Sequence, residues 1–412
     1  MYETPLTGLV LSGGGARAAY QVGVLRSIAK LRREALGPRS RLQSPFGVIC
    51  GTSAGAINAA ALACHADRFE ASVEVISKVW QNFSADQVYR ADSLGVIRSG
   101  ARWLTMMSIG WVIARWRRAR PRSLLDNEPL AELLRRLVPL DRLPMMLAER
   151  QLHALAITAS SYTSGDHFTF FSAAQTVEPW QRSQRVAAQT TLTQAHLLAS
   201  SAIPFVFPAA HLDHPGASGW FGDGSMRNTA PLSPAIHLGA QRLLIIGAGR
   251  LQEPGTRQVV DVGYPSLAQI AGHAMSSIFL DALQVDIERM KRINRTLALL
   301  PDSALADTTL RPMEALVISP SQRIDDIAAR HLGSLPAPVR ALLRGVGVSG
   351  EGASARGSAL ASYLLFEAPF TGELIKLGEA DTLARRDEVL SFFGWDRPPR
   401  RAPAADLDIN LP

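Results

Sequence analysis

A serine stands in a glycine-rich pentapeptide between an apolar run, residues 46–50, and a run of small residues. The pentapeptide is GTSAG, from Gly51 to Gly55, with Ser53 at its centre. A G-x-S-x-G sequence between a buried strand and a helix is typical of a nucleophile elbow, a bent turn that exposes the serine hydroxyl. The helix N-terminus then places positive dipole potential near the serine oxygen. We therefore predict that Ser53 is a catalytic nucleophile rather than a serine helix cap.

The elements that must position this serine alternate between strand and helix. Apolar runs predict buried strands over 7–11 and 46–50, and helical spacing predicts helices over 18–33 and 54–63. This order indicates an α/β fold with a parallel sheet and right-handed crossovers. Further strands are predicted over 152–159, 167–171, 242–246, 296–300 and 315–318. Residues 67–140, and most of the chain from about 250 to 394, read as mainly helical.

Two further elements are marked by helix-boundary residues. A helix is predicted over 191–201. Another should begin at Ser233-Pro234, with the serine as N-cap and the proline in the first turn, and end at Gly239. The glycine-rich segment 342–359 is the most linker-like part of the chain.

A nucleophilic serine needs a base, and histidine is the common one. None of the nine histidines is a clear candidate. His211, His214 and His237 are more typical of surface or packing histidines. An aspartate that acts directly on the serine is the other arrangement, so the residues alone leave the base open.

Three segments in order resemble the patatin-like phospholipases: LSGGGARAAYQVGVL, GTSAG and FGDGSMRNTAPLSPAIHLGA. The resemblance covers at least residues 7–248, and ASYLLFEAPFTGELIKLGEAD near the C-terminus is similar to bacterial members. It implies a three-layer α/β domain with a mostly parallel sheet. It also implies a lipid acyl hydrolase with a serine–aspartate dyad, and a phospholipid or lysophospholipid substrate.

The resemblance carries roles to particular residues of this chain. It implies Ser53 as nucleophile, Asp223 as base, and an oxyanion-hole loop made of Gly13, Gly14 and Gly15. Supporting positions are Arg17, Gly51, Gly55 and Gly224. This chain has Ala18 and Ser225 where the family commonly has glycine, and neither change removes a reacting group.

Elementary chemistry supports the same assignment. Successive glycines leave backbone N–H groups unshielded, so Gly13 to Gly15, together with the N–H of Ala54, suit a developing oxyanion. An aspartate beside a glycine is by itself usually a turn residue, so Asp223 gains its role from the other motifs.

The expected organisation is a patatin-like catalytic domain over 5–250, with a helical insertion or cap at 67–140. A mostly helical extension, 251–395, should pack on it, followed by a mobile tail, 396–412.

Two other function classes compete with the hydrolase. One is an inactive membrane-binding scaffold with the same fold. The other is a dinucleotide-binding protein, because Gly13-x-Gly15-x-x-Ala18 matches that fingerprint but lacks the acidic residue expected about 20 residues later.

Composition narrows the partners. The chain has a net charge of +7 and a pI of about 9.8, which suits an anionic partner. No nucleic-acid-binding motif is evident, so a membrane surface is favoured over nucleic acid. Segment 102–122, rich in tryptophan, methionine and arginine, is either a membrane-contacting helix or a cap over the site, and the two can coexist.

We expect no metal or cofactor. With no secretory signal or spanning run evident, we expect a cytoplasmic protein, and peripheral membrane contact is the alternative that segment 102–122 leaves open.

Overall fold

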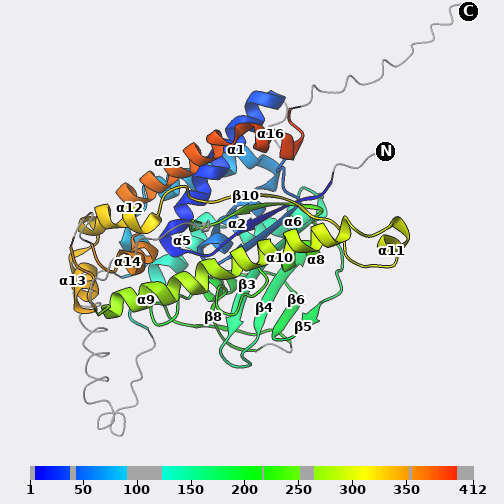
Figure 1. The fold of residues 1–412 in the computed structure, drawn as a ribbon. Coiled ribbons are helices and arrows are strands. Elements are labelled where there is room, and N and C mark those ends of the chain that lie inside the picture. Colours follow the sequence, from blue (N-terminus) through cyan, green and yellow to red (C-terminus); the bar gives the residue numbers. More distant parts are fainter. Residues whose placement is uncertain are drawn as a thin grey trace, which may run out of the picture.

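The computed structural model describes residues 5–37, 43–90, 123–215, 218–250, 264–350, 352 and 355–396. Helices flank a central sheet, and the two faces of the sheet carry different sets of them (Figure 1). The strands are β1 (Thr7–Leu11), β2 (Val48–Thr52), β3 (Ala154–Ser161), β4 (His167–Ala173), β5 (Gln181–Arg182), β6 (Arg185–Gln189), β7 (Ala210–Leu212), β8 (Gly219–Asp223), β9 (Arg242–Ile246) and β10 (Glu314–Ile318).

The longest of the described helices are α1, α10 and α15. They are α1 (Ala19–Leu36), α2 (Ala54–Ala63), α3 (Phe69–Gln81), α5 (Glu128–Leu137), α6 (Leu143–Ala148), α7 (Gln194–Ser200), α8 (Ser233–His237), α9 (Leu267–Ser276), α10 (Ala282–Leu297), α11 (Asp302–Ala306), α12 (Ile324–His331), α13 (Ala337–Gly345), α14 (Ser358–Leu364), α15 (Ala368–Ala384) and α16 (Arg386–Phe393). A short π-helix, Ser277–Asp281, joins α9 to α10.

The sheet is mixed but mostly parallel, as predicted. Its strand order is β10-β9-β1-β2-β3-β4-β6-β5, and β8 pairs with β3 and β7. The run from β10 to β3 is parallel throughout, whereas β4 and β8 lie antiparallel to β3. The carboxyl ends of β1 and β2 therefore meet at one edge of the sheet, which is where α/β folds place their sites.

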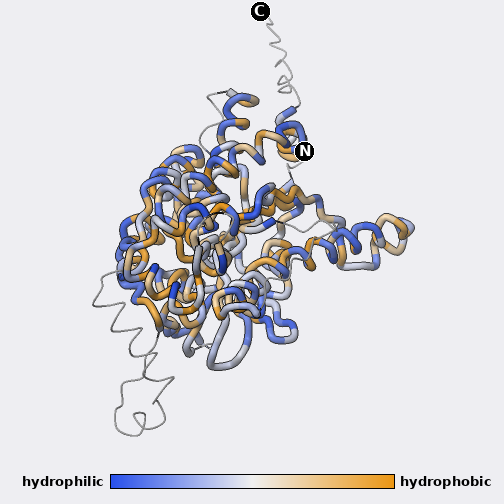
Figure 2. Tube along the Cα trace, turned by 60° about the vertical axis from the view of Figure 1, so that its left-hand side comes forward, coloured by the Kyte–Doolittle hydropathy of each residue, from blue (hydrophilic) through white to orange (hydrophobic). Residues whose placement is uncertain are grey.

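Alternate residues of the central strands enter two separate hydrophobic cores. In β1, Leu9 and Leu11 pack with α1, α2 and α15, whereas Val10 packs with α8 and α10. The strands are buried on both faces because each face is covered by helices, which explains their continuous apolar sequences. Hydrophobic stretches accordingly run through the interior of the chain trace (Figure 2). The predicted three-layer architecture is confirmed.

The predicted strand over 296–300 is wrong. Helix α10 continues through Leu297, and its last residues lead into a turn. Leu297 is 2% exposed, but Leu299 is 84% exposed, so this apolar run does not enter the sheet. A short apolar run is compatible with either a strand or a helix end, and here the preceding helical spacing prevails.

Two smaller predictions are corrected. The N-cap of α8 is Leu232, and Ser233 is the first helical residue and caps nothing with its side chain, although Pro234 lies in the first turn as expected. The linker-like segment 342–359 begins inside helix α13, and Gly357 packs against Ala268 of α9, where a Cβ would lie 2.7 Å from the alanine Cβ.

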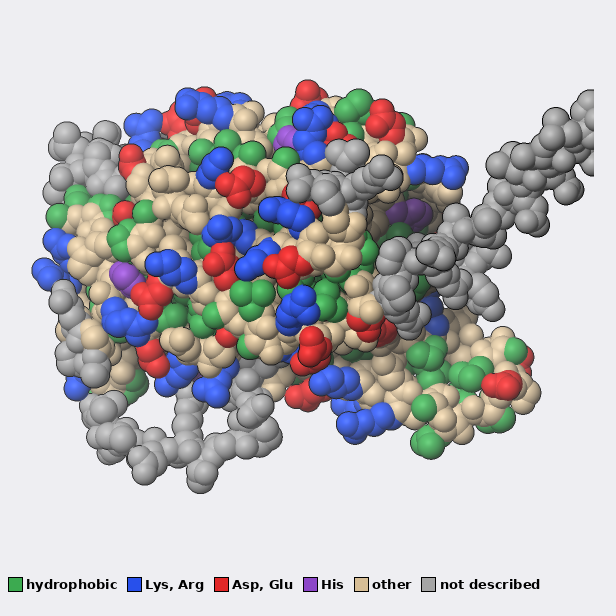
Figure 3. Space-filling view, turned by 90° about the horizontal axis from the view of Figure 1, so that it is seen from above, with side chains coloured by type: hydrophobic (Ala, Val, Ile, Leu, Met, Phe, Trp, Pro, Cys, Tyr) green, Lys and Arg blue, Asp and Glu red, His purple; other side chains and the backbone are tan. Residues whose placement is uncertain are grey.

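The predicted interfacial segment, 102–122, and residues 397–412 of the predicted tail lie outside the described residues. Among the described helices, none combines the length and apolar character needed to cross a membrane. On the face drawn in Figure 3, Lys and Arg side chains are interspersed with Asp and Glu, so the net positive charge does not form a single basic patch there.

Candidate active site

Ser53 occupies the turn between β2 and α2, in the conformation expected of a nucleophile elbow. Its backbone has φ 56° and ψ −130°, an unusual combination for a residue with a side chain. It is the N-cap of α2, yet its side chain makes no capping hydrogen bond. The hydroxyl instead donates to Asp223 Oδ2 at 2.6 Å. Ser53 is therefore not a serine helix cap of the ordinary kind.

The sheet brings these two residues together although they are 170 positions apart. Strand β2 pairs with β3 as far as Thr52, opposite Thr158. From Ala159 onward β8 pairs with β3 instead, and Asp223 lies opposite Ala159. The last residue of β8 therefore lies just beyond the end of β2, where Ser53 begins the turn. The sequence indicated only a glycine turn around Asp223, because β8 is short and contains two glycines.

Burial and hydrogen bonds set the state of Asp223. The residue is fully buried, and burial raises the pKa of its carboxyl to about 6, while hydrogen bonds from Ser53 and Ser225 partly oppose that rise. The Ser225 N–H donates to Asp223 Oδ1 at 2.8 Å. Ser225 is not among the described residues with positive φ, so the backbone accepts serine there without strain. A pKa near 6 leaves the carboxylate ionised at neutral pH and still basic enough to accept a proton.

The glycine-rich loop after β1 lies directly beside the serine. A Cβ placed on Gly13 would lie 3.0 Å from the Cβ of Ser53 and 2.3 Å from Oγ of Ser225. A Cβ on Gly55 would lie 2.5 Å from the carbonyl oxygens of Leu11 and Ser12. The absence of side chains thus permits the loop, the elbow and the start of α2 to pack backbone against backbone.

The first backbone N–H groups of α2 have no hydrogen-bond acceptor within the helix. Ala54 is its first residue, a position whose N–H has no intrahelical partner. Such N–H groups at a helix start favour negative charge nearby. The structure therefore brings together Gly13, Ala54, Ser53 and Asp223, four of the candidate site residues named from the sequence.

Three residues at the site were not predicted from the sequence. Ser200 Oγ accepts the Ser53 N–H at 2.9 Å, and Thr158 Oγ1 lies 2.8 Å from Thr52 Oγ1. The ring of His167 lies with Nε2 3.0 Å from the carbonyl oxygen of Gly224. Burial lowers the pKa of His167 to about 4, so its ring is neutral at pH 7. A lone serine, threonine or histidine in a strand or helix carries no motif that could have identified it.

An apolar pocket opens beside Ser53. It encloses about 760 Å³, its open mouth included, and runs between α2, α3 and α5. Its lining is mainly aliphatic and aromatic, and includes Ile57, Ile76, Val79, Trp80, Phe83, Leu134, Phe207 and Phe366. Asn58 stabilises one wall, because its Oδ1 accepts the indole N–H of Trp80 at 2.9 Å. Within the described residues, no group of three or more His, Cys, Asp or Glu side chains could hold a metal ion.

A comparison with solved structures found matches of low sequence identity and low TM-score. They include VipD from Legionella pneumophila (13% identity, TM-score 0.34, covering 93% of this chain and 67% of that one). Another is the type III effector ExoU from Pseudomonas aeruginosa (16% identity, TM-score 0.27, covering 97% of this chain and 90% of that one). A third is human GIVD cytosolic phospholipase A2 in complex with methyl gamma-linolenyl fluorophosphonate (13% identity, TM-score 0.39, covering 95% of this chain and 59% of that one).

Two comparisons of the sequence were made, one with curated proteins and one with models of protein families. A search of curated proteins found no match. The model of the patatin-like phospholipase family matches residues 9–236, which include the glycine-rich loop, the elbow and Asp223 and make up more than half of the chain. The chain therefore belongs to the patatin-like phospholipase family.

Proposed function

We propose that the protein hydrolyses fatty-acyl esters of phospholipids or lysophospholipids, using Ser53 and Asp223 as a catalytic dyad. Membership of a family of lipid acyl hydrolases gives the general reaction. The observation that carries the finer proposal is the 2.6 Å hydrogen bond from Ser53 Oγ to a buried carboxylate, at the wall of an apolar pocket. A pocket of this kind suits a fatty-acyl chain, whose transfer from water is favourable.

The proposed reaction has two steps. Asp223 accepts the hydroxyl proton as Ser53 Oγ attacks the ester carbonyl, and the N–H groups of Gly13 to Gly15 and Ala54 stabilise the oxyanion. The ester bond to the alcohol breaks, the departing alkoxide takes the proton from Asp223, and an acyl-enzyme remains. Water then gives a proton to Asp223 and attacks the acyl carbonyl. The fatty acid is released as Ser53 Oγ takes that proton back.

The two competing classes fit the structure less well. An inactive scaffold would not need the hydrogen-bonded pair or the unusual Ser53 backbone. A dinucleotide would need open space above the loop glycines for its pyrophosphate. Here a Cβ on Gly14 would lie 2.7 Å from the Cβ of Ala248, and one on Gly15 would lie 2.3 Å from the carbonyl oxygen of Tyr363.

The pH dependence of hydrolysis follows from the pKa of Asp223. Its carboxyl titrates near pH 6 rather than near 3.8, and only the ionised form can accept the serine proton. We expect kcat/KM for a non-ionising ester to rise with pH through about 6 and then level off. Initial rates from about pH 4 to about pH 8 measure this. A profile that is flat or falls with pH across this range would contradict the role of Asp223.

Product analysis tests the substrate class directly. Vesicles of mixed phospholipids and lysophospholipids are incubated with the protein, and the products are identified by mass spectrometry. The proposal predicts free fatty acid together with the matching deacylated lipid. Ser53→Ala, which removes one oxygen from a buried side chain, is the matched control. Equal product from both proteins, or none from the wild type, would refute the proposed function.

A further inference from the structure

We propose that Asp325 is a positioning residue for the catalytic site: through Arg17, it holds the glycine-rich loop against Ser53. This inference rests on the proposed function, because it concerns the loop that would bind the oxyanion. Asp325 lies in α12, far beyond residues 9–236 that the family model matches. The proposed site would thus be completed by a part of the chain outside the matched region.

The side chain of Arg17 turns away from the pocket and enters the later part of the chain. It is 3% exposed, and its Nη2 contacts Asp325 Oδ1 at 2.6 Å. Its Nε donates to Ser362 Oγ at 2.8 Å, and the guanidinium carbon lies 4.0 Å from the centre of the Tyr363 ring. A buried guanidinium needs a counter-charge, since removing one partner of such a pair leaves an uncompensated charge. Asp325 supplies that charge.

The backbone of the loop is in contact with the same part of the chain. A Cβ on Gly13 would lie 2.9 Å from Cδ1 of Phe279, in the π-helix between α9 and α10. Gly15 has φ +55°, and a Cβ placed on it would lie 2.3 Å from the carbonyl oxygen of Tyr363 in α14. The rings of Phe279 and Tyr363 are themselves 5.0 Å apart. Residues beyond 236 therefore form a wall behind the loop, and the Arg17–Asp325 pair attaches the loop to that wall.

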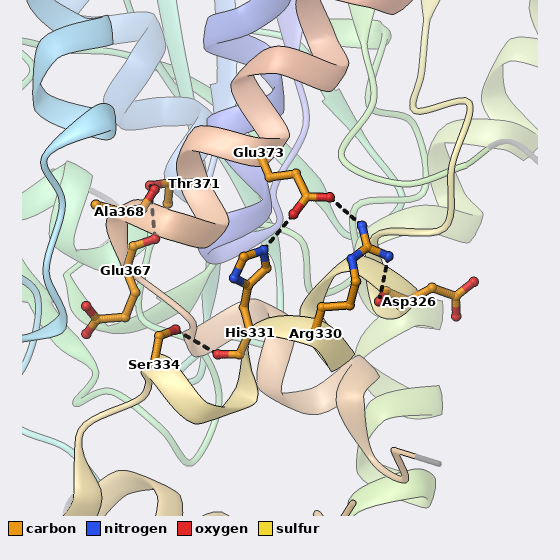
Figure 4. Close-up of polar contacts among 8 residues, drawn as sticks. All are labelled: Asp326, Arg330, His331, Ser334, Glu367, Ala368, Thr371 and Glu373. Atoms are coloured by element: carbon orange, nitrogen blue, oxygen red, sulfur yellow. Dashed lines mark hydrogen bonds and ion pairs between the residues drawn. The ribbon is translucent and has the colours of Figure 1, made fainter. Parts of the chain in front are cut away.

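Helix α12 is in turn fixed to α15. Asp325 stands in the first turn of α12, where the helix dipole favours a carboxylate. At the other end of the helix, Glu373 of α15 accepts from His331 Nε2 at 2.6 Å and pairs with Arg330 (Figure 4). The position of Asp325 is thus determined by a packed helix pair rather than by a surface loop.

The expected effect is on the chemical step. Donors to an oxyanion act only when they are accurately placed, and a displacement of about 1 Å can reduce the rate by about 10². Asp325 and Ser362 do not line the apolar pocket, so ground-state binding of the acyl chain should change little. Loss of the pair should therefore lower kcat while leaving KM nearly unchanged.

Asp325→Asn tests the inference, with Asp326→Asn as matched control. Asp326 is the next residue of the same helix turn, is exposed, and loses the same charge when substituted. With a soluble short-chain p-nitrophenyl ester, Asp325→Asn should lower kcat by about 10- to 10²-fold with KM within about twofold. Asp326→Asn should match the wild type, and Asp325→Glu, which keeps the charge, should recover most of kcat. Circular dichroism of each variant checks the fold.

Each outcome bears on a distinct claim. If Asp325→Asn retains the kcat of Asp326→Asn, the positioning role is wrong although the hydrolase stands. If Asp325→Asn does not fold, Ser362→Ala, which removes the acceptor of Arg17 Nε without removing a charge, should still lower kcat severalfold with KM unchanged, and a wild-type kcat there would overturn the inference. Absence of hydrolysis by the wild type would overturn the proposed function and this inference with it.

Discussion

Asp223→Asn is expected to lower kcat for ester hydrolysis by about 10⁴-fold. The amide has nearly the shape of the carboxylate and can remain within hydrogen-bond distance of Ser53 and of the Ser225 N–H. It cannot take the serine proton, so the nucleophile stays a neutral alcohol. Steady-state rates on a soluble ester, with the enzyme concentration fixed by absorbance, measure the change. Activity within tenfold of the wild type would mean that another group is the base.

The stability of Asp223→Asn separates lost chemistry from lost structure. The pKa of Asp223 is raised from 3.8 to about 6 in the folded protein, so folding favours its neutral form. The associated stability is present below about pH 4 and is lost as the pH rises through about 6. An amide does not ionise, so the variant should gain stability relative to the wild type across this window. Thermal unfolding at about pH 8 should show it no less stable than the wild type.

Ser53→Ala is expected to have the larger effect, a fall in kcat of about 10⁶. Removal of Oγ leaves no atom to form the acyl-enzyme, although the loop amides and the pocket remain to bind substrate. A residual rate above that of uncatalysed hydrolysis is expected from those groups.

Labelling by a fluorophosphonate probe gives an independent measure of the same residue. The wild type should be modified and Ser53→Ala should not. Ser201, which also lines the pocket, provides the matched control, because Ser201→Ala should be labelled like the wild type. Labelling of Ser53→Ala at the wild-type rate would place the nucleophile elsewhere.

The central layers of the fold could be predicted from the sequence because their signals are local. Strand β1, helix α2 and strand β9 have the predicted bounds, since each is an apolar or small-residue run ended by glycine or a change of period. The 296–300 prediction was wrong because the same run of apolar residues also fits the last turn of a helix. Helix α10 begins at Ala282, well before the predicted strand at 296–300.

The candidate site divides in the same way. Ser53 could be recognised from its pentapeptide and the elements around it, all within a few residues. Asp223 depended on the family resemblance, because its strand is short and its partner lies across the sheet. Asp325 and Ser362 could not be predicted, since they meet Arg17 across 308 and 345 residues of chain and belong to no motif. Only the packing of α12 and α14 behind the loop makes these contacts.

The most direct test of the dyad mechanism is to trap the acyl-enzyme. Wild-type protein is mixed with excess ester, quenched in acid within the first turnovers, digested, and mapped by mass spectrometry, with Ser53→Ala treated identically. We predict an acyl group on the peptide that contains Ser53, and none at that peptide in the variant. Rapid turnover of the ester accompanied by an acyl group on a different residue would contradict the mechanism.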